Sequence, residues 1–173
     1  GIYLDTDVEV LKSFNDLIDR SYFIGSEGGG NIEAAVIGSV KGSDWVKSCL
    51  DYYTNRDFIK MDGSLDTLTL PRIMMSEISK SRTVVEDIPE NVSISRQLEE
   101  HGQLFMFPEY YFCGKDHRTG IISITKNTYS VHHFAQSWIP ITTKLRHRFK
   151  VILVRLLGVN IVSKLTVFFG IKR

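Results

Sequence analysis

The hydrophobic pattern of the chain consists mainly of short strand-like runs. Strands are expected at residues 2–4, 22–25, 121–125 and 129–134, where apolar, β-branched or aromatic residues cluster or alternate. Residues 32–39 are small and apolar, and they fit either a buried strand or the start of a helix. The pattern therefore predicts a fold that mixes strands with helices.

Apolar residues at helical spacing predict two helices in the first half of the chain. The first follows Ser43, a suitable N-cap, and extends to about Asn55. The second begins at Thr69, with Pro71 near its start, where the missing N–H would have no partner in any case. A further short helical turn or irregular segment is expected at residues 14–18.

Three other segments have a distinct composition. Residues 26–31 contain three consecutive glycines, which allow a mobile loop or a close approach of the backbone. Residues 80–100 are polar and are expected to form a connection. Residues 104–112 are rich in aromatic side chains, which we expect to be buried.

The C-terminal segment has a helical apolar stripe with residues spaced by three and four: Leu145, Phe149, Ile152, Leu156 and Val159. Arg155 and Lys164 interrupt this apolar stretch, so it makes a poor membrane span. An interfacial helix on an anionic membrane surface fits the pattern better. The alternative is a helix that packs on the rest of the domain.

Charge and composition divide the 173-residue chain into two parts. Residues 144–173 carry eight Lys or Arg and no acidic residue, whereas residues 1–143 carry 13 basic and 20 acidic residues. We therefore expect one folded domain at residues 1–140 and a basic amphipathic helical tail at residues 141–173. The hydrophobic content of 43% excludes global disorder.

The two cysteines and the charge distribution limit the setting in which the protein works. Cys49 and Cys113 lie in separate segments without metal-ligand spacing, as is typical of reduced, buried cysteines in a cytoplasmic protein. The tail would hold such a protein at the inner face of the plasma membrane. We expect no nucleic-acid partner.

The strongest chemical signal is the pair Asp5 and Asp7, directly after the apolar run of residues 2–4. Carboxylates at the carboxyl end of a strand point toward the crevice where open α/β sheets bind ligands. Such oxygen ligands suit Mg²⁺ or Mn²⁺, and the cation would bridge to phosphate oxygens. Many Asp-x-Asp triplets, however, belong only to turns or helix caps.

His132 lies near the end of the strand expected at residues 129–134. A single histidine in such a place is commonly a structural hydrogen-bonding residue. If Asp5 and Asp7 share its crevice, its imidazole nitrogen would complete a site better suited to Mn²⁺ than to Mg²⁺.

These segments resemble a known family. Residues 1–9, Gly-Ile-Tyr-Leu-Asp-Thr-Asp-Val-Glu, resemble the DXD segment of the sugar-binding-region glycosyltransferases, family 32. The family includes bacterial capsular-polysaccharide transferases and the yeast initiating α-1,6-mannosyltransferase. Residues 124–138 resemble its closing motif, in which a histidine precedes a small residue and a tryptophan. Residues 31–38 and 62–73 also resemble bacterial members, so the resemblance spans residues 1–140.

The resemblance implies a GT-A-like, Rossmann-like α/β fold and a nucleotide-sugar donor. It assigns Asp5 and Asp7 to the metal and to the donor diphosphate, and His132 to the metal, Mn²⁺ or Mg²⁺. By the same resemblance Asn31, Ser137 and Trp138 would contact the donor; the list of donor residues is then Asp5, Asp7, Asn31, Ser137 and Trp138. Members are retaining transferases, and here the acceptor would be a glycan or a lipid-linked saccharide in capsular-polysaccharide or glycan synthesis.

The resemblance leaves the route to retention open. Double displacement needs a carboxylate near the anomeric carbon, for which Asp66 and Glu33 are the candidates. Front-side attack assisted by the leaving phosphate needs no protein nucleophile. Members also carry an N-terminal section that holds the nucleotide base, so we expect this chain to be the C-terminal portion of the fold.

Two other functions fit parts of the sequence. In a haloacid-dehalogenase-type phosphatase, Asp5 would be the nucleophile and Asp7 the acid and base. That class also needs a downstream lysine and a late acidic pair, yet after residue 100 only the separate Glu109 and Asp116 are acidic. A non-catalytic, membrane-docked chain is the third possibility.

Overall fold

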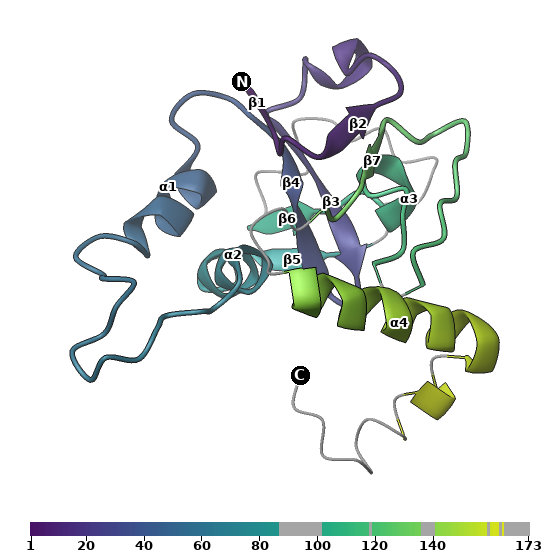
Figure 1. The fold of residues 1–173 in the computed structure, drawn as a ribbon. Coiled ribbons are helices and arrows are strands. Elements are labelled where there is room, and N and C mark those ends of the chain that lie inside the picture. The colour runs from purple at the N-terminus through teal and green to yellow at the C-terminus, as the bar shows by residue number, and fades with distance from the viewer. Residues whose placement is uncertain (87–101, 118, 136–140, 159, 163, 165–173) are drawn as a thin grey trace.

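The computed structural model describes residues 1–86, 102–117, 119–135, 141–158, 160–162 and 164 (Figure 1). The first half of the chain contains β1 (Ile2–Leu4), β2 (Val8–Val10), a 3₁₀ helix (Asn15–Leu17), β3 (Tyr22–Gly28), β4 (Asn31–Ser39), α1 (Asp44–Asp51) and α2 (Leu70–Ile78). The second half contains β5 (Thr83–Val85), β6 (Gln103–Phe105), α3 (Glu109–Phe112), β7 (Ser130–His132) and α4 (Ile141–Leu157). Strands and helices are thus mixed along the chain, while the GT-A-like assignment stays a prediction.

The central sheet is antiparallel, with the strand order β1-β4-β3. A parallel bridge between Gly25 and Phe107 joins β3 to the residues after β6, and β6 pairs in parallel with β5. A separate antiparallel pair, β2 and β7, packs beside the sheet (Figure 1). Because β4 has hydrogen-bonded neighbours on both sides, residues 32–39 form a strand rather than a helix.

Both faces of the central hairpin are covered, and each face has its own core. Helices α1 and α2 cover one face, and the cluster beneath them is Tyr22, Ile24, Ile32, Trp45, Cys49, Met74, Ile78, Leu104 and Met106. The other core is mainly aromatic and includes α3: Phe14, Leu17, Phe23, Val36, Phe107, Phe112 and Tyr129. The aromatic segment at residues 104–112 therefore contributes to both cores, as expected from its composition.

The three consecutive glycines form the tight turn of the β3–β4 hairpin. Gly28, Gly29 and Gly30 have φ values of +87°, +64° and +80°, which favour glycine strongly. A Cβ atom on Gly28 would lie 2.8 Å from a carboxylate oxygen of Glu109. Of the two expectations for this segment, the close backbone approach is the one that the structure shows.

Gly38 allows the Phe23 side chain to lie flat against β4. A Cβ atom at this position would lie 2.2 Å from the ring. We expect Gly38→Ala to lower the free energy of unfolding by about 1–3 kcal/mol through overpacking. Urea denaturation measures the effect, with Gly1→Ala as the control because a Cβ there meets nothing within 4 Å. Equal stability of the two variants would contradict this packing.

The fold differs from the sequence predictions in four places. The strand expected at residues 121–125 is wrong: Ile122 makes one isolated bridge to Lys115, and the isoleucines at 121, 122 and 124 are exposed. β2 was not expected, because three residues give too little pattern to recognise. β5 lies within residues 80–100, the segment expected to be a polar connection, of which residues 87–100 lie outside the described part. Helix α1 ends at Asp51, four residues before the predicted end.

Candidate metal site

Asp5 and Asp7 lie on the turn that connects the central sheet to the β2–β7 pair. The backbone N–H of Asp5 donates to the Ala35 carbonyl at 2.9 Å, which continues the pairing of β1 with β4. The Val8 N–H donates back to the Asp5 carbonyl at 3.1 Å and closes the turn. Both carboxylates therefore project from the turn between the central sheet and the β2–β7 pair.

His132 reaches this turn because β7 pairs with β2. Val8 and His132 are direct partners in the antiparallel ladder, and the His133 N–H donates to the Asp7 carbonyl at 3.0 Å. As a result, one ligand atom each from Asp5, Asp7 and His132 lie within 4.8 Å of one another. The structure thus brings together the three residues that the sequence nominated as metal ligands.

Glu33 fixes the imidazole of His132 from behind. Its carboxylate oxygens lie 3.2 and 3.3 Å from Nδ1, and its side chain is 1% exposed. Oε1 also accepts the Ala35 N–H at 2.8 Å, so the carboxylate has a fixed place. With Nδ1 occupied in this way, Nε2 faces Asp7, whose Oδ1 lies 3.6 Å away.

The local charge is strongly negative. Burial lowers the pKa of His132, but the hydrogen bond and charge of Glu33, with the charges of Asp7 and Asp5, outweigh it and raise the pKa above its usual value. Burial also raises the pKa of Glu27, and the charge of Glu33 raises it further. A cation held by Asp5 and Asp7 would reduce the repulsion among the carboxylates of this site.

Two hydrogen bonds that the sequence does not indicate orient the carboxylates of Asp5 and Asp7. The hydroxyl of Tyr3 donates to Oδ1 of Asp5, across two residues of the same segment. The backbone N–H of Ala135 donates to Oδ2 of Asp7 at 2.7 Å. Each aspartate therefore retains oxygen lone pairs for a further ligand.

Phe134 is a further residue of the site that the sequence did not indicate. Its ring centroid lies 3.9 Å from that of His132, with the planes inclined by 34°. It also has a positive φ of +52°, which is uncommon for a bulky side chain. This backbone conformation accompanies a contact that covers one face of the imidazole.

The segment around α3 positions β7. The Cys113 carbonyl accepts the His132 N–H at 2.9 Å, and the Phe112 carbonyl accepts the Ser130 hydroxyl at 2.8 Å. Lys115 donates through Nζ to the His133 carbonyl at 2.6 Å. The aromatic core that holds α3 therefore also determines where His132 lies.

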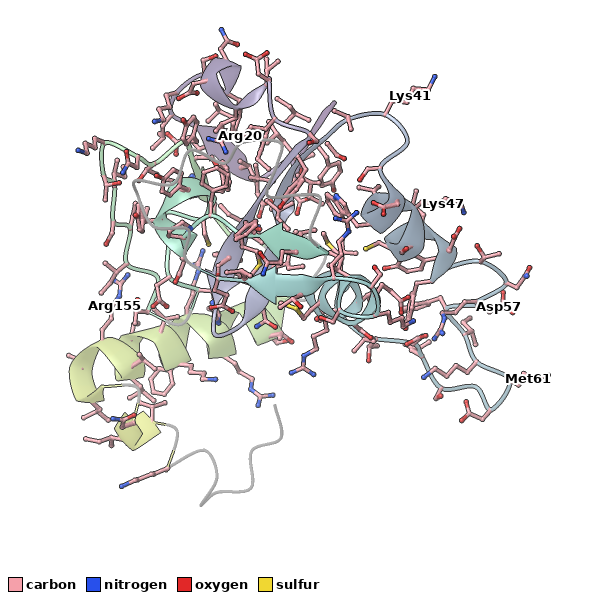
Figure 2. The ribbon with its side chains drawn as sticks, turned by 180° about the vertical axis from the view of Figure 1, so that it is seen from behind. Arg20, Lys41, Lys47, Asp57, Met61 and Arg155 are labelled. Atoms are coloured by element: carbon pink, nitrogen blue, oxygen red, sulfur yellow. The ribbon has the colours of Figure 1, made fainter. Side chains whose placement is uncertain are left out.

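The remaining candidate residues have different positions. Asp66 lies on the loop between α1 and α2 and pairs with Arg56 at 3.2 Å. Figure 2 labels Asp57 and Met61 on this loop, which extends away from the sheet. Glu33 is buried behind His132, an arrangement that suits a positioning residue better than a nucleophile.

Asn31 begins β4 next to the glycine turn, where it pairs with Gly28. It is two residues from Glu33, so the two side chains leave the same face of the strand. It does not belong to the group of three ligand residues. Ser137 and Trp138 lie outside the described residues.

Comparisons with known proteins do not assign this chain to a family. The chain matched no protein-family model, no curated protein and no solved structure.

Proposed function

We propose that the chain carries the metal- and diphosphate-binding site of a retaining glycosyltransferase. The enzyme would move a sugar from a nucleotide-sugar donor to a glycan or lipid-linked acceptor. The observation that carries this proposal is the convergence of Asp5, Asp7 and His132, with ligand atoms within 4.8 Å of one another. Two motifs that are far apart in the sequence thus supply the ligand atoms of one metal site.

The ligand atoms of this site fit Mn²⁺ better than Mg²⁺. Two carboxylates supply hard oxygen atoms, while the Nε2 atom of His132 supplies the nitrogen that Mn²⁺ accepts more readily. Glu33 behind the histidine is the kind of outer carboxylate that commonly orients a metal-binding imidazole. When bound, the cation would stabilise the charge that develops on the departing nucleoside diphosphate.

The positions of the carboxylates favour front-side attack over double displacement. Asp66 is held by Arg56 on the α1–α2 loop, and Glu33 is buried behind the imidazole. In the front-side route, the acceptor hydroxyl is deprotonated by the leaving phosphate. The chain's own residues then bind and orient the diphosphate without forming a covalent intermediate.

Mn²⁺ binding and turnover test the proposal together. Electron paramagnetic resonance measures binding of Mn²⁺ to the 173-residue chain. A panel of nucleotide sugars is assayed for release of nucleoside diphosphate with the chain extended by the N-terminal section that the family resemblance implies. We expect Mn²⁺ binding, tightened by a nucleoside diphosphate, and metal-dependent turnover of one donor. Phosphate release from a simple phosphomonoester would instead favour the phosphatase with Asp5 as nucleophile. Absence of both metal binding and turnover would favour the non-catalytic reading.

Glu33→Ala should lower the affinity for Mn²⁺ by about 10–100-fold, because it removes the carboxylate that orients His132. Glu33→Gln keeps a hydrogen-bond acceptor for Nδ1 and should lose less. Titration with Mn²⁺ measures both. Glu9→Gln is the control, since Glu9 pairs with the neighbouring His133 and does not contact His132. Equal affinities of Glu33→Ala and Glu9→Gln would contradict a positioning role.

A further inference from the structure

Helix α4 exposes an unbroken apolar stripe. Its residues, with their exposed fractions, are Ile141 at 74%, Leu145 at 57%, Phe149 at 63%, Ile152 at 53% and Leu156 at 75%. At 3.6 residues per turn these positions fall within about 80° of the helix circumference. The helix therefore presents a narrow hydrophobic face to solvent.

The opposite side of α4 is attached to the domain. Val154 is only 6% exposed, and it lies about 160° around the helix from Leu156 by the same helical geometry. Arg155 donates through Nε to the Thr119 carbonyl at 2.8 Å and through Nη2 to the Gly120 carbonyl at 3.0 Å. Figure 1 shows α4 lying across one end of the domain, and Figure 2 labels Arg155 on it. The helix is thus docked, and the exposed stripe is not its packing face.

Positive charge surrounds this stripe. Arg146, Arg148 and Lys150 are exposed on α4, and no acidic residue occurs from residue 144 to residue 173. The rest of the chain carries a net charge of −7. A partner for this face must therefore accept apolar side chains and carry negative charge at its surface.

The segment whose carbonyls accept from Arg155 also exposes apolar side chains. Ile121, Ile122 and Ile124 follow Gly120 directly and are 53%, 48% and 62% exposed. Single exposed apolar residues need no explanation, but five exposed apolar residues along one face of a helix indicate an interaction surface.

We propose that this face of α4 docks the protein on the surface of an anionic lipid bilayer. An interfacial helix buries an apolar face at the boundary between headgroups and acyl chains while its basic residues contact anionic headgroups. Among the described residues, none of the helices is long and apolar enough to cross a bilayer. The inference goes beyond the proposed transferase and does not depend on it.

Co-sedimentation with vesicles tests the apolar stripe. One set of vesicles is pure phosphatidylcholine and the other contains about 30% phosphatidylglycerol. We expect the chain to sediment with the anionic vesicles, and Leu145→Gln/Phe149→Gln to reduce partitioning at least about tenfold. Phe58→Gln is the control, since Phe58 is 61% exposed on the α1–α2 loop and closely matches Phe149.

The charge requirement is tested by Arg146→Glu/Arg148→Glu. We expect this variant to lose binding to the anionic vesicles, whereas Lys41→Glu/Lys126→Glu, with the same change of charge on exposed residues elsewhere, keeps it. Binding should also weaken as salt rises from about 0.1 M to about 0.5 M. Circular dichroism verifies that each variant folds.

Three results would overturn the proposal. The first is equal binding to neutral and anionic vesicles, and the second is no binding to either kind of vesicle. The third is a concentration-dependent dimer, seen by sedimentation velocity without vesicles, that Leu145→Gln/Phe149→Gln abolishes. Such a dimer would show that another copy of the chain covers this face.

Discussion

Asp7→Asn should reduce the affinity for Mn²⁺ by more than about 100-fold and abolish glycosyl transfer, a larger effect than loss of an outer-sphere residue. The amide keeps the size of the carboxylate and can still accept the Ala135 N–H, so the turn should persist. What it removes is the negative charge that a divalent cation requires. Asp5→Asn should behave in the same way. Mn²⁺ titration and donor hydrolysis measure the effect, and thermal unfolding shows that the fold remains.

The matched control for these variants is Asp57→Asn. Asp57 is exposed on the α1–α2 loop, away from the sheet (Figure 2), so the same loss of one charge should leave Mn²⁺ binding unchanged. If Asp5→Asn and Asp7→Asn both bind Mn²⁺ like the unmodified chain, the metal assignment fails. If all three variants lose affinity equally, the effect comes from net charge and not from ligation.

Phe112→Ala should have the largest effect on stability, lowering the free energy of unfolding by about 3–5 kcal/mol. The side chain is fully buried, and its ring centroid lies 5.6 Å from that of Phe23, 5.4 Å from that of Phe107 and 5.8 Å from that of Tyr129. Truncation therefore leaves a cavity at the centre of the aromatic core. Urea denaturation measures the change as a shift of the midpoint at constant slope.

Phe58→Ala is the control for this variant, because an exposed phenylalanine should cost no more than about 0.5 kcal/mol. Phe112→Ala should also weaken Mn²⁺ binding, because collapse into the cavity would shift the backbone carbonyl of residue 112, which accepts the hydroxyl of Ser130, two residues before His132. A Phe112→Leu variant, which fills part of the cavity, should recover part of both losses. A cost near that of Phe58→Ala would contradict the central role of this ring.

Local pattern was sufficient for much of the fold. The strands at β1, β3 and β7 and the helices α1, α2 and α4 fall within or overlap segments whose apolar periodicity predicted them. Pattern was misleading at residues 121–125, where isoleucines and polar residues suggest a strand but make only one isolated bridge within the part of the chain that the structure describes. An alternating pattern indicates only which side chains could be buried on one face. A strand also requires hydrogen-bond partners for its backbone N–H and C=O groups.

The candidate site shows the same division. Strand-end position and side-chain chemistry indicated Asp5 and Asp7, and the alternating segment indicated His132. Their proximity depends on the pairing of β2 with β7, which no three-residue strand could reveal in the sequence. For the same reason the sequence alone offers Glu33 as a nucleophile, whereas its buried contact with His132 is the basis for proposing a positioning role.

The sequence by itself determined the residue chemistry and the local periodicity: the two aspartates after an apolar run, the histidine on a strand, and the stripe of the basic tail. Tertiary structure alone decided which of these meet and which face solvent. It placed His132 against Asp7, put Glu33 behind the imidazole, and anchored α4 through Val154 and Arg155 so that its stripe stays exposed. The physical reason is that periodicity is set by neighbours in the chain, whereas contact and burial are set by packing between segments far apart in it.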